Sequence, residues 1–232
     1  MNKNIIVLGD GLLGKEIISQ IDWDWISRKK DGIDFGETDW YYMLKKYDQI
    51  INCIANTDTY SVDKKTHWKT NYISVMNLVD YCKEFNKKLI QISTDYIYAG
   101  SAKPALETDV PIPARTWYSL SKLLADEYIQ ARSKNYLIIR TSFKQNPFPH
   151  PEAITTQTGN FDYVDKISEL IIKLINKNAD GVFNVGTKRK TIYDLAIQTN
   201  PNVIGAFRIL NKEMPRDITM NVSKMEEFLN ES

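Results

Sequence analysis

A tyrosine and a lysine stand four residues apart in the segment YSLSK, as Tyr118 and Lys122. The apolar residues that follow recur at helical spacing, so we expect both side chains on one face of a helix. A free phenol has a pKa near ~10 and is a sluggish acid at neutral pH. An ammonium group about 4 Å away favours the phenolate by roughly 4 kcal/mol at an effective dielectric constant of ~20. The pair could therefore move a proton to or from a carbonyl oxygen.

Hydroxyl groups stand at the end of an apolar run upstream of this helix. The run Lys88–Ser93 reads as a strand, and Ser93 and Thr94 lie at its carboxyl end. Open α/β sheets bind ligands at that edge. We expect Thr94 to hold a substrate oxygen against Tyr118. The strand-end hydroxyl matters because Tyr-x-x-x-Lys alone is a weak motif in a chain with 13 tyrosines.

A glycine-rich string, GDGLLG, places Gly9, Gly11 and Gly14 between a first apolar strand and a first helical pattern. Gly9 permits a tight turn, Gly11 lets a pyrophosphate approach the backbone, and Gly14 lets helix and strand pack closely. The helix N-terminus adds N–H groups and a partial positive charge. These features predict a dinucleotide cofactor, and Lys122 would be placed to hydrogen-bond its nicotinamide ribose.

The residues after the second apolar run bear on which dinucleotide binds. An NAD site usually carries an acidic residue there for the ribose 2′-hydroxyl. This chain instead reads Ser27-Arg28-Lys29-Lys30. A hydroxyl followed by cations suits a 2′-phosphate, so we predict NADPH, with NADH as the alternative.

The candidate residues require a sheet that brings several strand ends together. Apolar runs separated by segments of helical periodicity predict a parallel sheet covered on both faces, a Rossmann-type doubly wound α/β fold. The strand-like runs are Asn4–Leu8, Trp23–Ser27, Gln49–Ile54, Lys88–Ser93 and Tyr136–Arg140.

Proline-rich Asn146–Pro151 must run as an extended loop and marks the expected boundary region. We expect a dinucleotide-binding domain over residues 1–142. A small C-terminal substrate lobe over residues 143–232 would interleave its elements with the sheet and lie over the carboxyl ends of the strands. The lobe's expected elements are a helix near Tyr163–Asn176, a strand at Gly181–Val185, a helix opening near Thr191 and a short helix from Ser223.

Composition excludes several other classes. The 232 residues include 30 Lys and Arg and 29 Asp and Glu, so the chain lacks the excess of positive charge that binding to nucleic acid requires. Cys53 and Cys82 read as reduced thiols of a reducing compartment. The apolar stretch before Asp10 is too short for a signal peptide, and no run approaches a membrane span, so we expect a cytoplasmic protein. The only histidines, His67 and His150, lie in no ligand-spaced cluster, so no metal is expected.

The chain resembles the dTDP-4-dehydrorhamnose reductases, a family of the extended short-chain dehydrogenases/reductases. The likeness implies reduction of a nucleotide-linked 4-keto-6-deoxy sugar, with NADPH or NADH as the hydride donor. It rests on GDGLLG, NCIANT (Asn52–Thr57), STDYIYAG, YSLSKLLAD, IRTSF (Ile139–Phe143), TQTGNFDYVD (Thr156–Asp165), GVFNVG (Gly181–Gly186) and PRDITMNVSKMEEFL.

The resemblance implies roles for particular residues. It makes Thr94, Tyr118 and Lys122 catalytic. Substrate contacts are expected from Ser93, Thr94, Asp95, Tyr96 and Phe143, the last standing where the family usually has tryptophan. With the glycine turn and the basic string included, the expected cofactor contacts are Gly9, Gly11, Leu12, Leu13, Gly14, Ser27, Arg28, Lys29, Asp34, Phe35, Cys53, Ile54, Ala55, Thr57, Tyr118 and Lys122.

Other functions stay open at this point. Only 13 residues separate Phe143 from Gln157, a shorter substrate segment than the family has. A C4 epimerase would keep the same catalytic residues. A non-catalytic binding subunit, such as the regulatory subunit of methionine adenosyltransferase, resembles the same family. A dehydratase is disfavoured because Tyr96, not a second acid, follows Asp95.

Two surface features also leave alternatives. The basic string Lys188-Arg189-Lys190 could bind a substrate diphosphate or form a solvated loop. The aromatic-rich helix from Tyr118 could form the face of a homodimer, and the sequence does not decide it.

Overall fold

The computed structural model describes residues 4–207 and 213–231, and its chain divides into two compact units. Unit 1 takes the chain through Ser93, then Thr116–Ile139 and Asp180–Val182. Unit 2 takes Thr94–Arg115, Arg140–Ala179 and the chain from Phe183. The chain therefore passes from one unit to the other immediately after Ser93.

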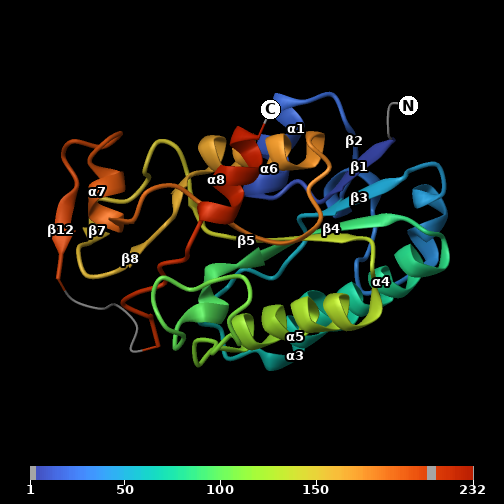
Figure 1. Cartoon of the computed structure of the whole chain (residues 1–232), viewed down its shortest axis with the longest axis horizontal. Coiled ribbons are helices and arrows are strands. Elements are labelled where there is room, and N and C mark those ends of the chain that lie inside the picture. Colours follow the sequence, from blue (N-terminus) through green and yellow to red (C-terminus); the bar gives the residue numbers. More distant parts are fainter. Residues whose placement is uncertain (1–3, 208–212, 232) are drawn as a thin grey trace. The chain divides into compact units, whose positions relative to one another are not determined.

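Unit 1 is built on a six-stranded sheet in the order β10-β5-β4-β3-β1-β2 (Figure 1). Strand β1 pairs in parallel with β2 and β3, and β3 pairs in parallel with β4. The Rossmann-type α/β fold is thereby confirmed. The strands are β1 (Ile5–Leu8), β2 (Asp24–Ile26), β3 (Gln49–Asn52), β4 (Lys88–Thr94), β5 (Tyr136–Thr141) and β10 (Gly181–Val185).

The strand order reverses at β1, which has β2 on one side and β3 on the other. Open α/β sheets bind ligands at such a switch point, outside the carboxyl ends of the strands. The fully described segment between Ser27 and Gln49 forms no strand; it holds the short helix α2 (Arg28–Asp31) and the 3-10 helix η1 (Asp39–Leu44). The sheet thus ends at β2 on this side.

Helices cover the sheet of unit 1 and complete its core. Ile6, Leu8, Ile50, Leu78 and Ile138 are fully buried members of one apolar cluster. Each such side chain contributes about 1.5–3 kcal/mol through its removal from water. The helical segments are α1 (Leu12–Gln20), α3 (Lys64–His67), the π-helical η2 (Trp68–Ile73), α4 (Ser74–Glu84) and α5 (Trp117–Arg132).

Unit 2 has its own core, around Phe161, Tyr163, Leu195 and Ile218. Its helices are η3 (Asp95–Tyr98), α6 (Val164–Asn176), α7 (Ile192–Ala196) and α8 (Ser223–Asn230). Its short strands form the pairs β6 (Phe143–Lys144) with β9 (Asp162–Tyr163), β7 (Glu152–Ile154) with β12 (Ile204–Ala206), and β8 (Thr158–Gly159) with β11 (Lys190–Thr191).

The proline-rich segment 146–151 lies inside unit 2. Phe148 is buried in the unit's core, and its backbone N–H donates to the hydroxyl of Thr199 at 3.0 Å. The helix expected near Thr191 begins at Ile192, because the Thr191 hydroxyl and the Asp194 carboxylate form a capping box. Among the described helices, none combines the length and apolar character that crossing a membrane requires.

Candidate active site

The glycine turn joins β1 to α1 as the sequence predicts. Gly9 has a φ of 91°, which favours glycine, and Gly11 is the N-cap residue of α1. A Cβ atom on Gly14 would lie 2.1 Å from the Gly9 carbonyl oxygen, so close packing of helix on strand requires glycine there. A Cβ atom on Gly11 would meet none of the described residues within 4 Å.

This turn fits the diphosphate of a dinucleotide. Among the described residues, no side chain caps the N-terminus of α1, so its first N–H groups are left for a ligand. Leu12 is exposed, whereas Leu13 is buried. The exposed backbone donors and the helix dipole together form an anion cradle.

The segment after β3 lies against the same turn. The Cys53 N–H donates to the Leu8 carbonyl oxygen at 3.0 Å. A Cβ atom on Gly9 would lie 2.7 Å from Cγ1 of Ile54. Burial raises the pKa of the Cys53 thiol to about 12, so this sulfur is uncharged at neutral pH. The structure therefore brings together the cofactor residues expected after β1 and β3, at the switch point of the sheet.

Two buried polar side chains hold the loop that follows Cys53. Asn71, on η2, accepts from the Asn56 N–H at 2.8 Å and donates to the Asn56 carbonyl oxygen at 3.0 Å. Its amide also donates to the Ser121 hydroxyl on α5 at 3.3 Å. The buried His67 ring lies edge-on to Tyr118, with centroids 6.2 Å apart. Sequence reasoning missed both residues, because they lie in the mostly polar segment KKTHWKTNYI (residues 64–73), where two further polar side chains do not stand out.

The basic string after β2 consists of one buried capping residue, Ser27, and three exposed cations. The buried Ser27 hydroxyl accepts from the Lys30 N–H at 3.1 Å, so it caps α2. Lys30 donates to the Trp25 carbonyl oxygen at 2.9 Å and lies 4.1 Å from the centre of the Trp25 ring. Arg28 and Lys29 are exposed. Three residues were predicted to contact a 2′-phosphate. Arg28 and Lys29 are exposed to solvent, whereas the Ser27 hydroxyl is already used as the cap of α2.

The two residues of the Asp34–Phe35 pair lie in different environments. Asp34 is exposed and accepts from the Gly36 N–H at 2.9 Å, which lowers the pKa of its carboxyl group. Phe35 is buried in the core beside Trp40, with ring centroids 6.2 Å apart. The side chain of Phe35 therefore packs, and its expected role as a cofactor contact stays a prediction.

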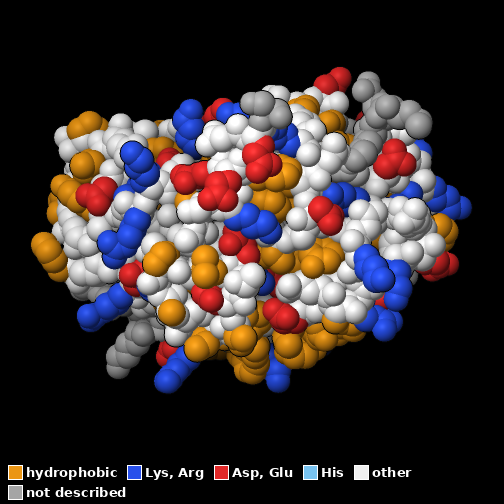
Figure 2. All heavy atoms as spheres, in the orientation of Figure 1, with side chains coloured by type: hydrophobic (Ala, Val, Ile, Leu, Met, Phe, Trp, Pro, Cys, Tyr) orange, Lys and Arg blue, Asp and Glu red, His pale blue; other side chains and the backbone are white. Residues whose placement is uncertain are grey.

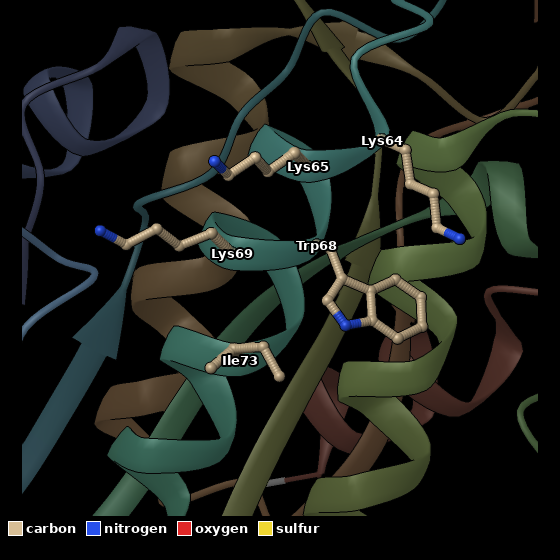
Figure 3. Close-up of a pocket in the computed structure, with 5 residues that line it drawn as sticks. All are labelled: Lys64, Lys65, Trp68, Lys69 and Ile73. Atoms are coloured by element: carbon tan, nitrogen blue, oxygen red, sulfur yellow. The ribbon is translucent and has the colours of Figure 1, made fainter.

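Lys69 ties this turn to η2. Its ammonium lies 3.3 Å from a carboxylate oxygen of Glu37 and 3.7 Å from one of Asp34. Its stem crosses Gly36 so closely that a Cβ atom there would lie 1.9 Å from Cε of Lys69. Lys69 and Lys65 extend to the same side of the helical segment, while Trp68 lies on the other side (Figure 3). This contact was not predicted, because Gly36 and Lys69 lie 33 positions apart and no motif links them.

Tyr118 and Lys122 lie one turn apart on α5, as predicted. Lys122 is only 2% exposed, and its ammonium donates to the Ile92 carbonyl oxygen of β4 at 2.5 Å. Burial lowers the pKa of this ammonium to about 8, and the negative charge of nearby Asp126 opposes the shift. Lys122 is thus a buried cation beside β4 and can change its charge near neutral pH.

Ser93, at the end of β4 in unit 1, has an internal partner. Its hydroxyl donates to a carboxylate oxygen of the buried Asp126 at 2.8 Å. This bond uses the proton of the hydroxyl, so Ser93 retains only acceptor capacity for any ligand. Its expected substrate contact stays a prediction.

Thr94 and Asp95 begin unit 2, and both are buried. The Thr94 hydroxyl accepts from the Tyr96 N–H at 3.3 Å and lies 3.3 Å from Oδ1 of Asp95. Burial raises the pKa of Asp95 to about 7, and Lys144 opposes the shift. Within the described chain, Oδ2 of Asp95 has no hydrogen-bond partner. Asp95 is therefore a buried carboxyl group that can hold a proton at neutral pH.

Other candidates of unit 2 lie in different settings. Phe143 is half-buried on β6, and the Tyr96 hydroxyl lies 3.3 Å from Nε2 of Gln157. In the basic string at 188–190, Arg189 lies 3.4 Å from Asp217 and Lys190 lies 2.6 Å from Asp162. Two of its three cations thus have carboxylate partners, which favours the structural role of this loop over diphosphate binding.

The parallel sheet and the open glycine turn at its switch point define a Rossmann-type α/β protein. Residues 3–144 match the family model described as the RmlD substrate binding domain. The chain belongs to this family.

Individual relatives agree with that assignment. The spore coat polysaccharide biosynthesis protein SpsK of Bacillus subtilis is 29% identical over 111 residues, which are 41% of this chain and 39% of the relative. The dTDP-4-dehydrorhamnose reductase of Mycobacterium tuberculosis is 23% identical over 162 residues, 60% of this chain and 53% of the relative. The matches thus span about half, or less, of these curated relatives.

A solved structure shows the same fold over nearly the whole chain. It is the dTDP-4-dehydrorhamnose reductase of Bacillus anthracis in complex with NADP, with a TM-score of 0.83 and 20% sequence identity. The superposition covers 99% of this chain and 96% of that one.

Proposed function

We propose that this protein is an NADPH-dependent reductase of a nucleotide-linked 4-keto-6-deoxy sugar. The observation that carries the proposal is the buried Lys122, one helical turn from Tyr118 on α5 and bonded to β4. The two side chains supply a proton donor and a neighbouring cation, which are the groups that reduction of a carbonyl requires. The family assignment supplies the substrate class, since a relative in this family carries the name dTDP-4-dehydrorhamnose reductase.

The chemistry follows from the two side chains of α5. When bound, the nicotinamide supplies a hydride to the carbonyl carbon. Tyr118 donates its hydroxyl proton to the carbonyl oxygen, and the product is an alcohol. The charged form of Lys122 stabilises the tyrosinate that this transfer leaves behind. Solvent then returns the proton to Tyr118.

Residues around the glycine turn hold the cofactor in this proposal. The N–H groups at the start of α1 bind the diphosphate, and Gly11 leaves room for it. Arg28 and Lys29 provide the positive charge that a 2′-phosphate prefers. A structure of the fold with NADP bound supports this choice of cofactor. The remaining proposed contacts are Asp34, Phe35, Cys53, Ile54, Ala55 and Thr57.

For Thr94 we propose the role that the family resemblance gives it, a hydrogen bond to the substrate oxygen. The first residues of unit 2, Asp95 and Tyr96, and the half-buried Phe143 are proposed to contact the sugar nucleotide. The two free cysteines are consistent with a reducing compartment, so we place the protein in the cytoplasm. A homodimer is also proposed, and light scattering of the purified chain tests it.

The deciding experiment follows NADPH oxidation with dTDP-4-dehydrorhamnose as substrate, for the wild type and Tyr118→Phe. We expect stoichiometric conversion of NADPH by the wild type and a rate at least about 100-fold lower for the variant, because general acid catalysis contributes on this scale. The variant should still bind NADPH, because the other proposed cofactor contacts remain.

The alternatives give different results in the same assay. An epimerase would convert a nucleotide sugar without net consumption of NADPH. A regulatory subunit would bind the dinucleotide and turn over none of the keto sugars. Either result would replace the reductase proposal.

A further inference from the structure

A concavity of unit 1 lies at the other end of the strands from the glycine turn. It has a volume of about 480 Å³ and is lined by the end of α4, the end of α5 and the loops that lead into β4 and β5. These loops enter the amino-terminal edge of a parallel sheet, whereas Gly9 and Cys53 follow the carboxyl ends of β1 and β3. The concavity is therefore separate from the proposed dinucleotide site.

Four cations line this concavity: Lys83, Lys87, Arg132 and Lys134. In the described part of the chain, none of the four forms an ion pair. The lining includes no Asp or Glu. Cys82 also lines it, and burial raises the pKa of this thiol to about 12, so the sulfur adds no negative charge.

The ends of two helices place some negative charge nearby. The C-termini of α4 and α5 each carry roughly half a negative charge, so together they offset about one of the four cations. Basic side chains at helix ends often do no more than balance this dipole. Here they exceed it about fourfold. Glu84 and Glu127 lie on the same helices, but neither lines the concavity, and Glu127 accepts from Gln130.

The lining combines charge with hydrogen-bonding groups. Lys87 is buried and donates to the carbonyl oxygens of Lys45 and Tyr47 at 2.8 and 2.5 Å, so its charge is fixed in place. Lys83 and Lys134 are exposed and can reach a ligand. Polar lining comes in addition from Asn86, Gln130, Ser133 and Asn135.

We propose that this concavity binds a phosphorylated small molecule. Its volume lies within the range of small-molecule sites, about 300–1,000 Å³. A phosphate group gathers charge-assisted hydrogen bonds from ammonium and guanidinium donors, and amides and a hydroxyl suit the rest of a phosphate ester. The site does not depend on the proposed reductase activity.

The test is titration of the isotope-labelled protein with inorganic pyrophosphate, followed residue by residue by NMR. The backbone amide signals of Asn86, Ser133 and Asn135 should shift and saturate below ~10 mM pyrophosphate, an affinity in the range of a small polar ligand. The double variant Lys83→Gln/Lys134→Gln should bind at least about tenfold more weakly at this site. Lys64→Gln/Lys65→Gln, with the same change of charge elsewhere in unit 1, is the matched control and should bind as the wild type does.

Three results would overturn the proposal. One is a lack of shifts at these amides, including the case in which only the amides of Leu12, Leu13 and Gly14 respond. Another is equal affinity of the two double variants. The third is tighter binding of duplex DNA or polyglutamate than of pyrophosphate at the same amides, which would identify a macromolecular partner instead.

Discussion

The ammonium of Lys122 donates a 2.5 Å hydrogen bond to the carbonyl oxygen of Ile92, so a buried charge on α5 is held by the backbone of β4. The neighbouring Asp126 is in turn bonded to Ser93, near the end of the same strand. Residues of one helix and one strand thus fix the cation whose charge the proposed proton transfer requires.

The pH dependence of activity should report the charge of Lys122. Burial lowers the pKa of its ammonium from 10.5 to about 8, so the cation is present below pH 8 and is lost above it. We expect kcat for the keto sugar to fall with a descending limb near pH 8, and Lys122→Met to lower kcat at least about 100-fold. A profile that stays flat to pH 10 in the wild type would contradict this role.

Two glycines of one turn should respond differently to alanine. Gly14→Ala places a Cβ atom 2.1 Å from the Gly9 carbonyl oxygen and should lower the free energy of unfolding by about 1–3 kcal/mol. Gly11→Ala meets none of the described residues within 4 Å, and as an N-cap substitution it should cost at most about 1 kcal/mol, while its methyl group blocks the diphosphate. Chemical denaturation and NADPH titration measure the two effects. Normal NADPH affinity of a folded Gly11→Ala variant would place the diphosphate elsewhere.

The exposed cations of α2 should decide the cofactor preference. Arg28→Gln/Lys29→Gln should raise the Kd of NADPH about tenfold or more and leave that of NADH nearly unchanged, because only NADPH carries the 2′-phosphate. Lys30→Gln is the control, since Lys30 is already bonded to Trp25. Equal losses for both cofactors, or tighter binding of NADH than of NADPH by the wild type, would argue against a 2′-phosphate site here.

Asp95 should make stability depend on pH. Its pKa is 3.8 in an unfolded chain and about 7 when buried, so the folded state binds the proton more tightly between these values. The free energy of unfolding should therefore fall as pH rises from 5 to 8, and Asp95→Asn should remove roughly 2 kcal/mol of that fall. The positive charges of Lys144 and Lys103 favour the ionised carboxylate and so oppose this rise in the pKa of Asp95. Chemical denaturation of the wild type and of Asp95→Asn at pH 5 and pH 8 measures this fall. An equal fall in the free energy of unfolding for both proteins would contradict the role of Asp95.

Surface charge on the visible face agrees with the balanced composition. Basic and acidic side chains are interspersed on this face (Figure 2).

Local signals in the sequence determined the fold class and the placement of the main motifs. The alternation of apolar runs with helical periodicity fixed β1, β3, β4 and β5 within a few residues, because a buried strand needs apolar side chains on both faces. The glycine turn was predictable for a similar reason, since the positive φ of Gly9 and the close approach at Gly14 each require the absence of a side chain. Tyr118 and Lys122 could be placed together because helix geometry sets their spacing.

Tertiary contacts determined the burial and the hydrogen-bond partners of the residues in those motifs. Only the fold shows that Lys122 is buried against Ile92, that Ser27 caps a helix, that Phe35 belongs to the core and that Lys69 crosses Gly36. The partners in these contacts come from distant segments, and sequence spacing carries no information about which of them meet. The sequence by itself therefore determined the elements and the candidate chemistry, while burial and long-range packing determined the pKa values and the side chains left available for ligands.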